Sequence, residues 1–532
     1  MAVNQLHWVD YLIIALTLLI TVVVGLGFAK RQKSIATYFK AGGSLPSWAI
    51  GMSILATLIS SVTFLAYPGE GYSSNWILLV QGLMVPLVLL VIIRFVVPLF
   101  RNVIKLSAYE YFEQRFGVVA RYYTSMSFML THFAKMGSVL YLISLAVSGM
   151  LGINTSVIIL LIGAAIILLT LFGGIEAVVW LDVIQGFLLI VGGVVALIIL
   201  LFGLDGGPVD IWNVAMDAGK IGFGPFDWDF VQLTFWVMAL NGIFYAIQKY
   251  GTDQTIVQRY LTARTDKAAV RASLLGVLMC VPVWALFMFI GTALFSYYQI
   301  GGAEHSLPVG IKADAVFPHF IMHELPVGII GLVISALIAS AISSLDSDLN
   351  CLSAILVEDY YKRVYPDSTD EQQLKMGRWF IALAGIGAVA IALFYVQAGE
   401  GGVLDMIFAL YAIFSGGIAG MFMLGIFAAR ANKKGLYWGM LACFLFIAWA
   451  LLTSTPLGIG NKKSILVDLG QFNYTHHEYM MGVYSHIVLV VVGFFASLCY
   501  PKENVNLALT WKGWKQETRN KKQETKKQRN KF

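Results

Sequence analysis

Residues 46–72, "PSWAIGMSILATLISSVTFLAYPGEGY", decide the fold of this chain. The segment is apolar and long enough to cross a bilayer as a helix, which takes about 20 residues. Its middle, from Ala56 to Thr63, is instead rich in small and hydroxyl-bearing residues. A second apolar segment, 239–264, "ALNGIFYAIQKYGTDQTIVQRYLTAR", is interrupted near Gly251. Because lipid cannot satisfy freed backbone groups, we expect both interruptions to face protein or a water-filled cavity.

The rest of the chain has the composition of a polytopic membrane protein. Of its 532 residues, 58% are hydrophobic and 12% are charged, whereas soluble chains carry about 25% charged residues. We predict an all-helical transmembrane domain over residues 1–500 and a basic cytoplasmic tail over 501–532. About thirteen spans are expected, starting near Val9, Ser47, Trp76, Tyr122, Ser156, Ala177, Thr234, Ala272, Val327, Met376, Leu404, Leu436 and Met481.

Positive charges are sorted to one side of these spans. When the loops are numbered alternately, 29 of the 36 Lys and Arg residues, Arg259 among them, fall in one set, 4 in the other and 3 within spans. Lys and Arg accumulate on the cytoplasmic side. We therefore predict a plasma-membrane protein with its N-terminus outside and its C-terminus in the cytoplasm. The net charge of +6 comes mostly from the tail and does not indicate a nucleic-acid partner.

The two interrupted segments each begin a run of five predicted spans. Corresponding broken helices in two halves of a chain are typical of inverted-repeat transporters, whose binding site lies at the breaks. We therefore expect core repeats at about 46–203 and 234–427. The alternative is that Ser and Gly only allow close packing between helices.

A row of hydroxyls lies in the span "VGIIGLVISALIASAISSLDSDLNCLSAILVEDYYKR", residues 327–363. Ser340, Ser343, Ser344 and Ser347 are spaced to share one helix face, with Asp346 at its edge. Hard cations prefer oxygen ligands of this kind. Such a face beside an unwound helix with free carbonyls predicts a sodium site. The alternative is that each hydroxyl bonds to a carbonyl of its own helix.

Three ionisable residues within spans point to function, because charges in the membrane are costly. Asp182 is suited to complete a second sodium site. Lys135 either pairs with Asp182 or Asp346, or contacts an anionic substrate. Lys249, beside the second interruption, has the same two interpretations.

Three motifs resemble one transporter family. They are "GGIEAVVWLDVIQG" (173–186), "TDQTIVQRYLTAR" (252–264) and "ISSLDSDLNCLSAILVEDYYKR" (342–363). From about Val9 to Cys499 the chain resembles the sodium/solute symporter family, which includes the sodium–glucose, sodium–multivitamin and bacterial sialic acid transporters. The resemblance implies a LeuT-like five-plus-five inverted repeat, with one extra helix in front and two behind.

The resemblance also implies sodium ligands. A first site would use carbonyls of the broken helix and the facing serine row: Ala56, Ile59, Ser340, Ser343 and Ser344. At the Ser340 position the family often has Ala, so a carbonyl suffices there. A second site, present in some members, would consist of Asp182, Ser343, Asp346 and Ser347. Asp346 departs from the hydroxyl residue usual at its position; this carboxylate would tighten sodium binding, take a proton or pair with Lys135.

For the substrate, residues 54–72 are most similar to the bacterial sialic acid transporters. This implies that Ser60, Thr63, Gln81 and Lys135 contact it, with Lys135 standing where those transporters have Arg. We expect sodium-coupled import of sialic acid or a related carboxylated sugar by alternating access. The alternatives are a neutral hexose or another organic anion, and more remotely a sensor with a transporter fold. No catalytic Ser–His–Asp or HExxH spacing occurs in the spans, so we expect no enzyme. The expected partners are the solute, sodium ions and the bilayer, with no obligate protein partner evident.

Overall fold

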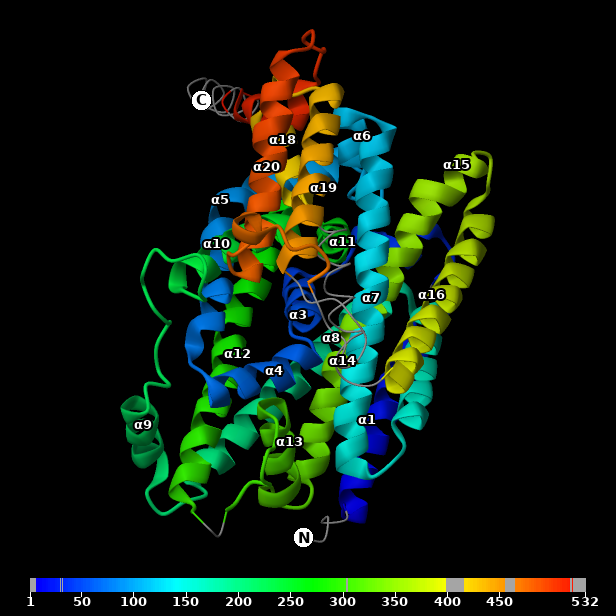
Figure 1. The fold of residues 1–532 in the computed structure, drawn as a ribbon. Coiled ribbons are helices and arrows are strands. Elements are labelled where there is room, and N and C mark those ends of the chain that lie inside the picture. Colours follow the sequence, from blue (N-terminus) through cyan, green and yellow to red (C-terminus); the bar gives the residue numbers. More distant parts are fainter. Residues whose placement is uncertain are drawn as a thin grey trace, which may run out of the picture.

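The computed structural model describes residues 6–28, 30, 32–302, 305–398, 416–454, 465–516 and 519, and every named element of secondary structure in this part of the chain is a helix (Figure 1). Nine of its helices are long and apolar enough to cross a membrane. They are α1 (Trp8–Gly27), α5 (Leu79–Val103) with the turn before it, α7 (Val118–Leu151), α8 (Thr155–Phe202), α12 (Asp266–Ile300), α14 (Ile329–Ile355), α16 (Asp370–Ala398), α19 (Lys433–Ser454) and α20 (Glu478–Leu498).

The shorter helices complete the chain between these spans. They are α2 (Ile35–Lys40), α6 (Glu110–Phe116), α9 (Gly207–Asp217), α10 (Phe235–Gly251), α11 (Gln254–Thr262), α13 (Ala313–Glu324), α15 (Lys362–Val364) and α18 (Ile418–Phe427). The first part of the predicted span that begins near Leu404 lies outside the described residues, and α18 forms its last part. Helix α6 is a short helix ahead of α7 that mixes aromatic and charged residues.

The two predicted spans near Ser156 and Ala177 form one 48-residue helix, α8, that is broken at Gly174. A straight helix of this length would measure about 72 Å, more than twice the hydrocarbon core. Gly174 has φ 60° and ψ −172°, a backbone conformation that only glycine adopts readily. The residues before the break pack on α7 and α16, and those after it pack on α3, α12 and α14. The break therefore separates two spans with different neighbours.

Both interruptions predicted from the sequence are real. Helix α3 (Ser47–Leu58) and α4 (Ser61–Ser73) meet at a 57° bend, and counting this pair as one span gives ten membrane-crossing elements among the described residues. Ile59, between them, has extended backbone (φ −89°, ψ 94°). Helices α10 and α11 are likewise separated, by Thr252 and Asp253.

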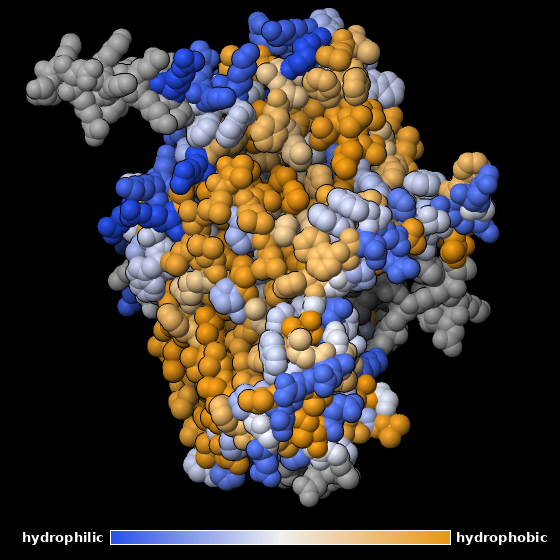
Figure 2. Space-filling view, turned by 90° about the vertical axis from the view of Figure 1, so that its left-hand side faces the viewer, coloured by the Kyte–Doolittle hydropathy of each residue, from blue (hydrophilic) through white to orange (hydrophobic). Residues whose placement is uncertain are grey.

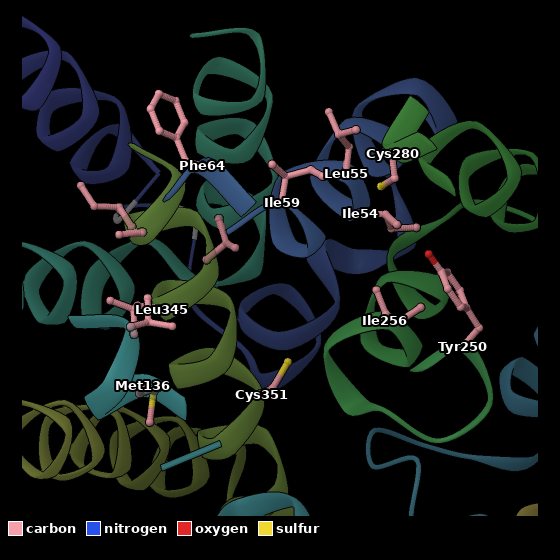
Figure 3. Packing of buried hydrophobic residues seen from close by; sticks show 14 of the residues in the cluster. Ile54, Leu55, Ile59, Phe64, Met136, Tyr250, Ile256, Cys280, Leu345 and Cys351 are labelled. Carbon is pink, nitrogen blue, oxygen red and sulfur yellow. The ribbon is translucent and has the colours of Figure 1, made fainter. Parts of the chain in front are cut away.

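Apolar side chains cover the outside of the molecule as well as its core. Figure 2 shows a broad hydrophobic surface on one face, with most strongly hydrophilic residues toward its margins. Exposed apolar residues of this kind include Leu278 on α12 and Val91 on α5. Inside, Figure 3 shows side chains from α3, α4, α7, α11 and α14 packed around the first break. A surface and a core that are both apolar are what a multi-pass membrane protein requires.

Candidate functional site

The first break faces the serine row of α14. Ser343 Oγ lies 3.1 Å from the carbonyl oxygen of Ala56 and 3.1 Å from that of Ser340. The residues at the break, Ala56 and Ile59, are 2% and 0% exposed. A buried hydroxyl therefore meets main-chain carbonyl oxygen from the unwound end of α3. This confirms the predicted juxtaposition of the broken helix and the row.

The other serines of this row behave differently from one another. Ser340 Oγ donates to the Leu337 carbonyl of its own helix at 2.7 Å. For this serine the alternative holds, namely that the hydroxyl bonds within its own helix. Ser344 Oγ is buried and has no hydrogen-bond partner among the described residues. Buried polar atoms are nearly always paired, so an unpaired one needs an explanation. The unpaired oxygen of Ser344 beside Ser343 gives this position spare ligand capacity for a cation.

Asp182 is held in a buried polar cluster by residues that the sequence did not point to. Its Oδ2 atom accepts hydrogen bonds from Ser53 Oγ on α3 at 2.5 Å and from Arg259 Nη2 on α11 at 2.9 Å. Arg259 also donates to Ser347 Oγ on α14 at 2.7 Å and to the Thr255 carbonyl at 2.6 Å. The cluster therefore joins four helices around one carboxylate.

The predicted place of Arg259 in a cytoplasmic loop is wrong. The side chain is fully buried, because the break after α10 turns α11 back into the protein and carries Arg259 to Asp182. A buried arginine is stable only when its charge is paired and its donors are used. The guanidinium here has four hydrogen-bonding contacts to Ser53, Asp182, Ser347 and Thr255.

Asp346 lies at the edge of the same cluster. Ser347 Oγ approaches Asp346 Oδ1 at 3.4 Å, whereas Asp346 Oδ2 and Asp182 Oδ1 have no hydrogen-bond partner among the described residues. With both carboxyl groups ionised and one guanidinium paired with Asp182, the cluster would carry one net negative charge. A monovalent cation would balance it and would use the two free carboxylate oxygens.

Lys135 pairs with a residue that was not anticipated. Its Nζ atom lies 2.9 Å from Asp348 Oδ2, so the prediction that its protein partner is Asp182 or Asp346 is wrong. On α14, Asp348 lies two residues beyond Asp346 and therefore points to another side of the helix. His132 Nε2 lies 3.7 Å from both Asp348 and Asp253. The lysine thus belongs to a second network, in which its partner is Asp348 and not Asp182 or Asp346.

Lys249 is part of the second break itself. It forms an ion pair with Asp253 at 2.7 Å and donates to Thr255 Oγ1 at 3.2 Å. Asp253 in turn caps α11, because its Oδ1 atom accepts from the Thr255 backbone N–H at 2.8 Å. Of the two interpretations of Lys249, these contacts favour the pairing one.

The remaining predicted substrate residues lie on α4 and α5. Ser60 and Thr63 begin α4 directly after the break, and Gln81 lies on α5 where its backbone closely approaches Gly242 of α10. The side chains of Ser60 and Gln81 are half-buried. Within the described part of the chain, none of these three side chains has a hydrogen-bond partner. Their polar groups are therefore available to a ligand.

Sequence reasoning missed Ser53, Arg259, Asp348 and His132. Asp348 had a signal, since a second carboxylate in "SLDSDLN" sits in the middle of an apolar span. Arg259 had a weaker one, because its distance from the α10 break allowed either a loop or a return into the protein. Ser53 and His132 look like ordinary packing residues until their partners are known.

Comparisons with known proteins agree with this geometry. The model of the sodium:solute symporter family matches residues 38–443. The sodium/sialic acid symporter NanT of Aliivibrio fischeri is 34% identical over 91% of each chain. SiaT, the sodium/sialic acid symporter of Proteus mirabilis, is 36% identical over 83% of this chain and 90% of its own.

Solved structures give the same result for the fold. A substrate-bound, outward-open Na⁺-coupled sialic acid symporter, whose description includes a novel Na⁺ site, superposes with a TM-score of 0.84 at 32% identity, covering 94% of this chain and 99% of its own. The nucleobase-cation symporter Mhp1, at 15% identity and a TM-score of 0.56, covers 87% of this chain and 95% of its own and shares the fold alone. A broken helix facing a buried serine row, within a fold and sequence of this kind, shows that the chain belongs to the sodium:solute symporter family of membrane transporters.

Proposed function

We propose that this protein imports sialic acid, or a closely related carboxylated sugar, together with sodium ions. The observation that carries the proposal is the contact of Ser343 with the Ala56 carbonyl at the α3–α4 break. Relatives that match more than four-fifths of this chain at 34% and 36% identity are sodium/sialic acid symporters. Site geometry and relatedness therefore support the same function.

The first sodium ion is assigned to the α3–α4 break. Its ligands are the carbonyls of Ala56, Ile59 and Ser340 and the hydroxyls of Ser343 and Ser344. The Ser340 hydroxyl is not needed, because it is bonded within its own helix. Sodium at this position would replace the hydrogen bond from Ser343 to Ala56, so that the hydroxyl oxygen and the carbonyl oxygen both face the ion. The ion would tie α14 to the broken helix that also begins the substrate site.

The second sodium ion is assigned to Asp182, Ser343, Asp346 and Ser347. The free oxygens of the two carboxylates support this assignment. The ion pair with Arg259 makes the two carboxylates unequal in the charge that they offer to a cation. Asp182 is already balanced by the guanidinium at 2.9 Å, so Asp346 supplies the charge that attracts a cation.

The substrate site is assigned to Ser60, Thr63, Gln81 and Lys135. A lysine pairs with a carboxylate as a point charge, without the two-pronged geometry of arginine. Lys135 is 29% exposed in its pair with Asp348. A sugar carboxylate would therefore share the ammonium group with Asp348 instead of meeting a free charge.

We assign thirteen spans to the whole chain, with the N-terminus outside and the basic tail in the cytoplasm. In this topology the core repeats are 46–203 and 234–427, and each begins with one of the two broken helices. Helix α1 precedes the repeats, and α19 and α20 follow them. This arrangement is the five-plus-five inverted repeat.

Charge counting favours two sodium ions for each sialic acid. One charge crossing 100 mV gains about 2.3 kcal/mol. A single sodium ion with a sialate anion carries no net charge, so the membrane potential would do no work on the pair. Two ions leave one net positive charge and make uptake electrogenic.

Uptake of labelled sialic acid by proteoliposomes tests the proposal. An inward sodium gradient should drive accumulation, whereas an equal potassium gradient should not. An inside-negative potential should increase the rate. Sodium-independent uptake would refute the coupling, and failure to take up sialic acid alongside sodium-driven uptake of another solute would refute the substrate.

A neutral hexose is the second candidate substrate. The ion pair of Lys135 with Asp348 favours it, because the lysine charge is already balanced inside the protein. Competition between labelled sialic acid and glucose in the same proteoliposomes separates the two candidates.

A further inference from the structure

A groove on the outside of the protein lies apart from the ion and substrate sites. It lies between the start of α16 and the residues of α8 just before the Gly174 break, and it encloses about 440 Å³. Leu171, Leu374 and Ala382 form apolar walls, and Lys375, Arg378 and Trp379 supply the polar and aromatic lining. One acidic residue, Glu371, also lines it. The lining is therefore amphipathic and carries one net positive charge.

The two cations in this groove have unused hydrogen-bonding capacity. Lys375 is exposed and forms no ion pair with the described acidic residues. The guanidinium of Arg378 lies over the Tyr38 ring, at 5.7 Å, and donates a long hydrogen bond of 3.4 Å to the Gln32 carbonyl. Its Nε atom is buried without a partner among the described residues. An anionic group entering the groove would meet the positive charges of Lys375 and Arg378, which both line it.

The groove also sits at the boundary between polar and lipid-facing surface. Trp379 is 59% exposed, and Leu383 and Ile386 below it on the same side of α16 are each 60% exposed. Tryptophan with adjoining basic residues is typical of the membrane interface, and exposed leucine and isoleucine are typical of the lipid-facing surface. This order matches the regions of one lipid. The two basic residues would meet the headgroup, Trp379 the glycerol region, and the exposed leucine and isoleucine the acyl chains.

We propose that this groove binds the headgroup of an anionic phospholipid. A zwitterionic headgroup would bring its own cation toward Lys375 and Arg378 and would gain less. Basic pockets between transmembrane helices near the cytoplasmic surface are suited to anionic headgroups. The lipid would hold the start of α16 against α8 at its break and so would brace the joint between the two α8 spans.

Native mass spectrometry of the full-length protein tests the proposal. The protein is delipidated in detergent and titrated with phosphatidylglycerol or with phosphatidylcholine of the same acyl chains. Wild type should retain phosphatidylglycerol in preference to phosphatidylcholine. Each basic residue near an anionic surface is worth about fivefold in affinity. Lys375→Gln should therefore weaken the first phosphatidylglycerol about fivefold, and Lys375→Gln with Arg378→Gln about 25-fold.

A matched control pair exists on α12. Lys267 and Arg271 are exposed basic residues near the start of that helix, and Lys267→Gln with Arg271→Gln should leave the first lipid unchanged. Lys375→Arg keeps the positive charge and should retain binding. Because Lys375 makes no ion pair with the described acidic residues, its substitution should not disturb folding, and a loss of binding in Lys375→Gln would then reflect the lost charge. The proposal would be overturned if wild type retained phosphatidylglycerol and phosphatidylcholine equally, or if the control pair lost as much phosphatidylglycerol as the groove variants. It would also be overturned if water-soluble glycerophosphoglycerol competed as well as phosphatidylglycerol itself.

Discussion

The two broken helices differ in their charges and contacts, although each is interrupted by a short non-helical segment. The α3–α4 break contains no charged residue, and its buried backbone faces hydroxyls of α14. The α10–α11 break is charged and internally satisfied, because Lys249 pairs with Asp253 and Asp253 caps α11. At the first break a main-chain carbonyl oxygen, that of Ala56, meets the Ser343 hydroxyl of α14. The second carries a charge, that of Arg259, to a buried carboxylate.

Two charged clusters extend from the second break to α14. One joins Arg259 to Asp182 and Ser347. The other connects Asp253 through His132 to Asp348 and Lys135. Both clusters reach the helix whose serines face the first break. A cation at the proposed first site would therefore lie near groups that the second break positions. If binding of the cation and of the substrate is coupled through these groups, each raises the affinity for the other by the same factor.

Breaking the Arg259 cluster should have the largest effect. Arg259→Met leaves the Asp182 carboxylate buried without its counter-charge, a loss of about 3–5 kcal/mol in stability. Thermal unfolding of the purified protein in detergent measures it. The double variant Arg259→Met with Asp182→Asn removes both charges and should recover a substantial part of the loss. A double variant as unstable as the sum of the two single variants would show that the pair does not interact.

Substitution of Lys135 tests whether the second cluster binds the substrate, as proposed, or is only structural. A hydrogen bond to a charged group contributes about 1.5–3 kcal/mol, so Lys135→Ala should weaken sialic acid binding roughly 10-fold to 100-fold. Binding of an analogue with an alcohol in place of the carboxylate should change far less. Asp348→Asn frees the lysine and should strengthen carboxylate binding. Equal losses for acid and alcohol would make Lys135 structural.

The first break can be tested with two serines of one helix. Ser343→Ala removes a hydroxyl that faces the Ala56 carbonyl and should raise the sodium concentration for half-maximal uptake on the order of tenfold. Ser340→Ala removes a hydroxyl that is bonded to its own helix and should leave that concentration unchanged. The comparison is measured by sodium titration of sialic acid uptake. An equal effect of the two substitutions would contradict the assigned ligands.

The smallest expected effect concerns the short helix α6, which adjoins the second break. The preceding loop is bonded to α11, since the Ala108 N–H donates to Gln254 Oε1 at 2.7 Å. Burial raises the pKa of Glu110 from 4.5 to about 7. The folded state therefore holds this proton more tightly than the unfolded state, and the contribution of Glu110 to stability falls as pH rises from 4.5 through 7.

Glu110→Gln should remove this pH dependence. The melting temperature of the variant relative to wild type should therefore be higher at pH 8 than at pH 5. The same difference at both pH values would show that Glu110 keeps an ordinary pKa.

The sequence predicted the parts of this structure that depend on local pattern. The approximate starts of the apolar helices, both helix interruptions and the spacing of Ser343 and Ser344 follow from hydrophobicity and helical periodicity. Contacts between residues that are far apart in the sequence do not follow from local pattern. The pairing of Lys135 with Asp348 depends on how α7 and α14 rotate against each other, and the burial of Arg259 depends on the direction that the chain takes after Thr252. Both are set by tertiary packing, which a single sequence leaves open.

The central claim is that a sodium ion bound between the α3–α4 break and the α14 serines prepares the protein for its substrate. Calorimetric titration of the purified protein with sialic acid, in sodium and in an equal concentration of choline, tests it most directly. We expect binding about tenfold tighter in sodium, and loss of that difference in Ser343→Ala but not in Ser340→Ala. Equal affinity in sodium and in choline would contradict it.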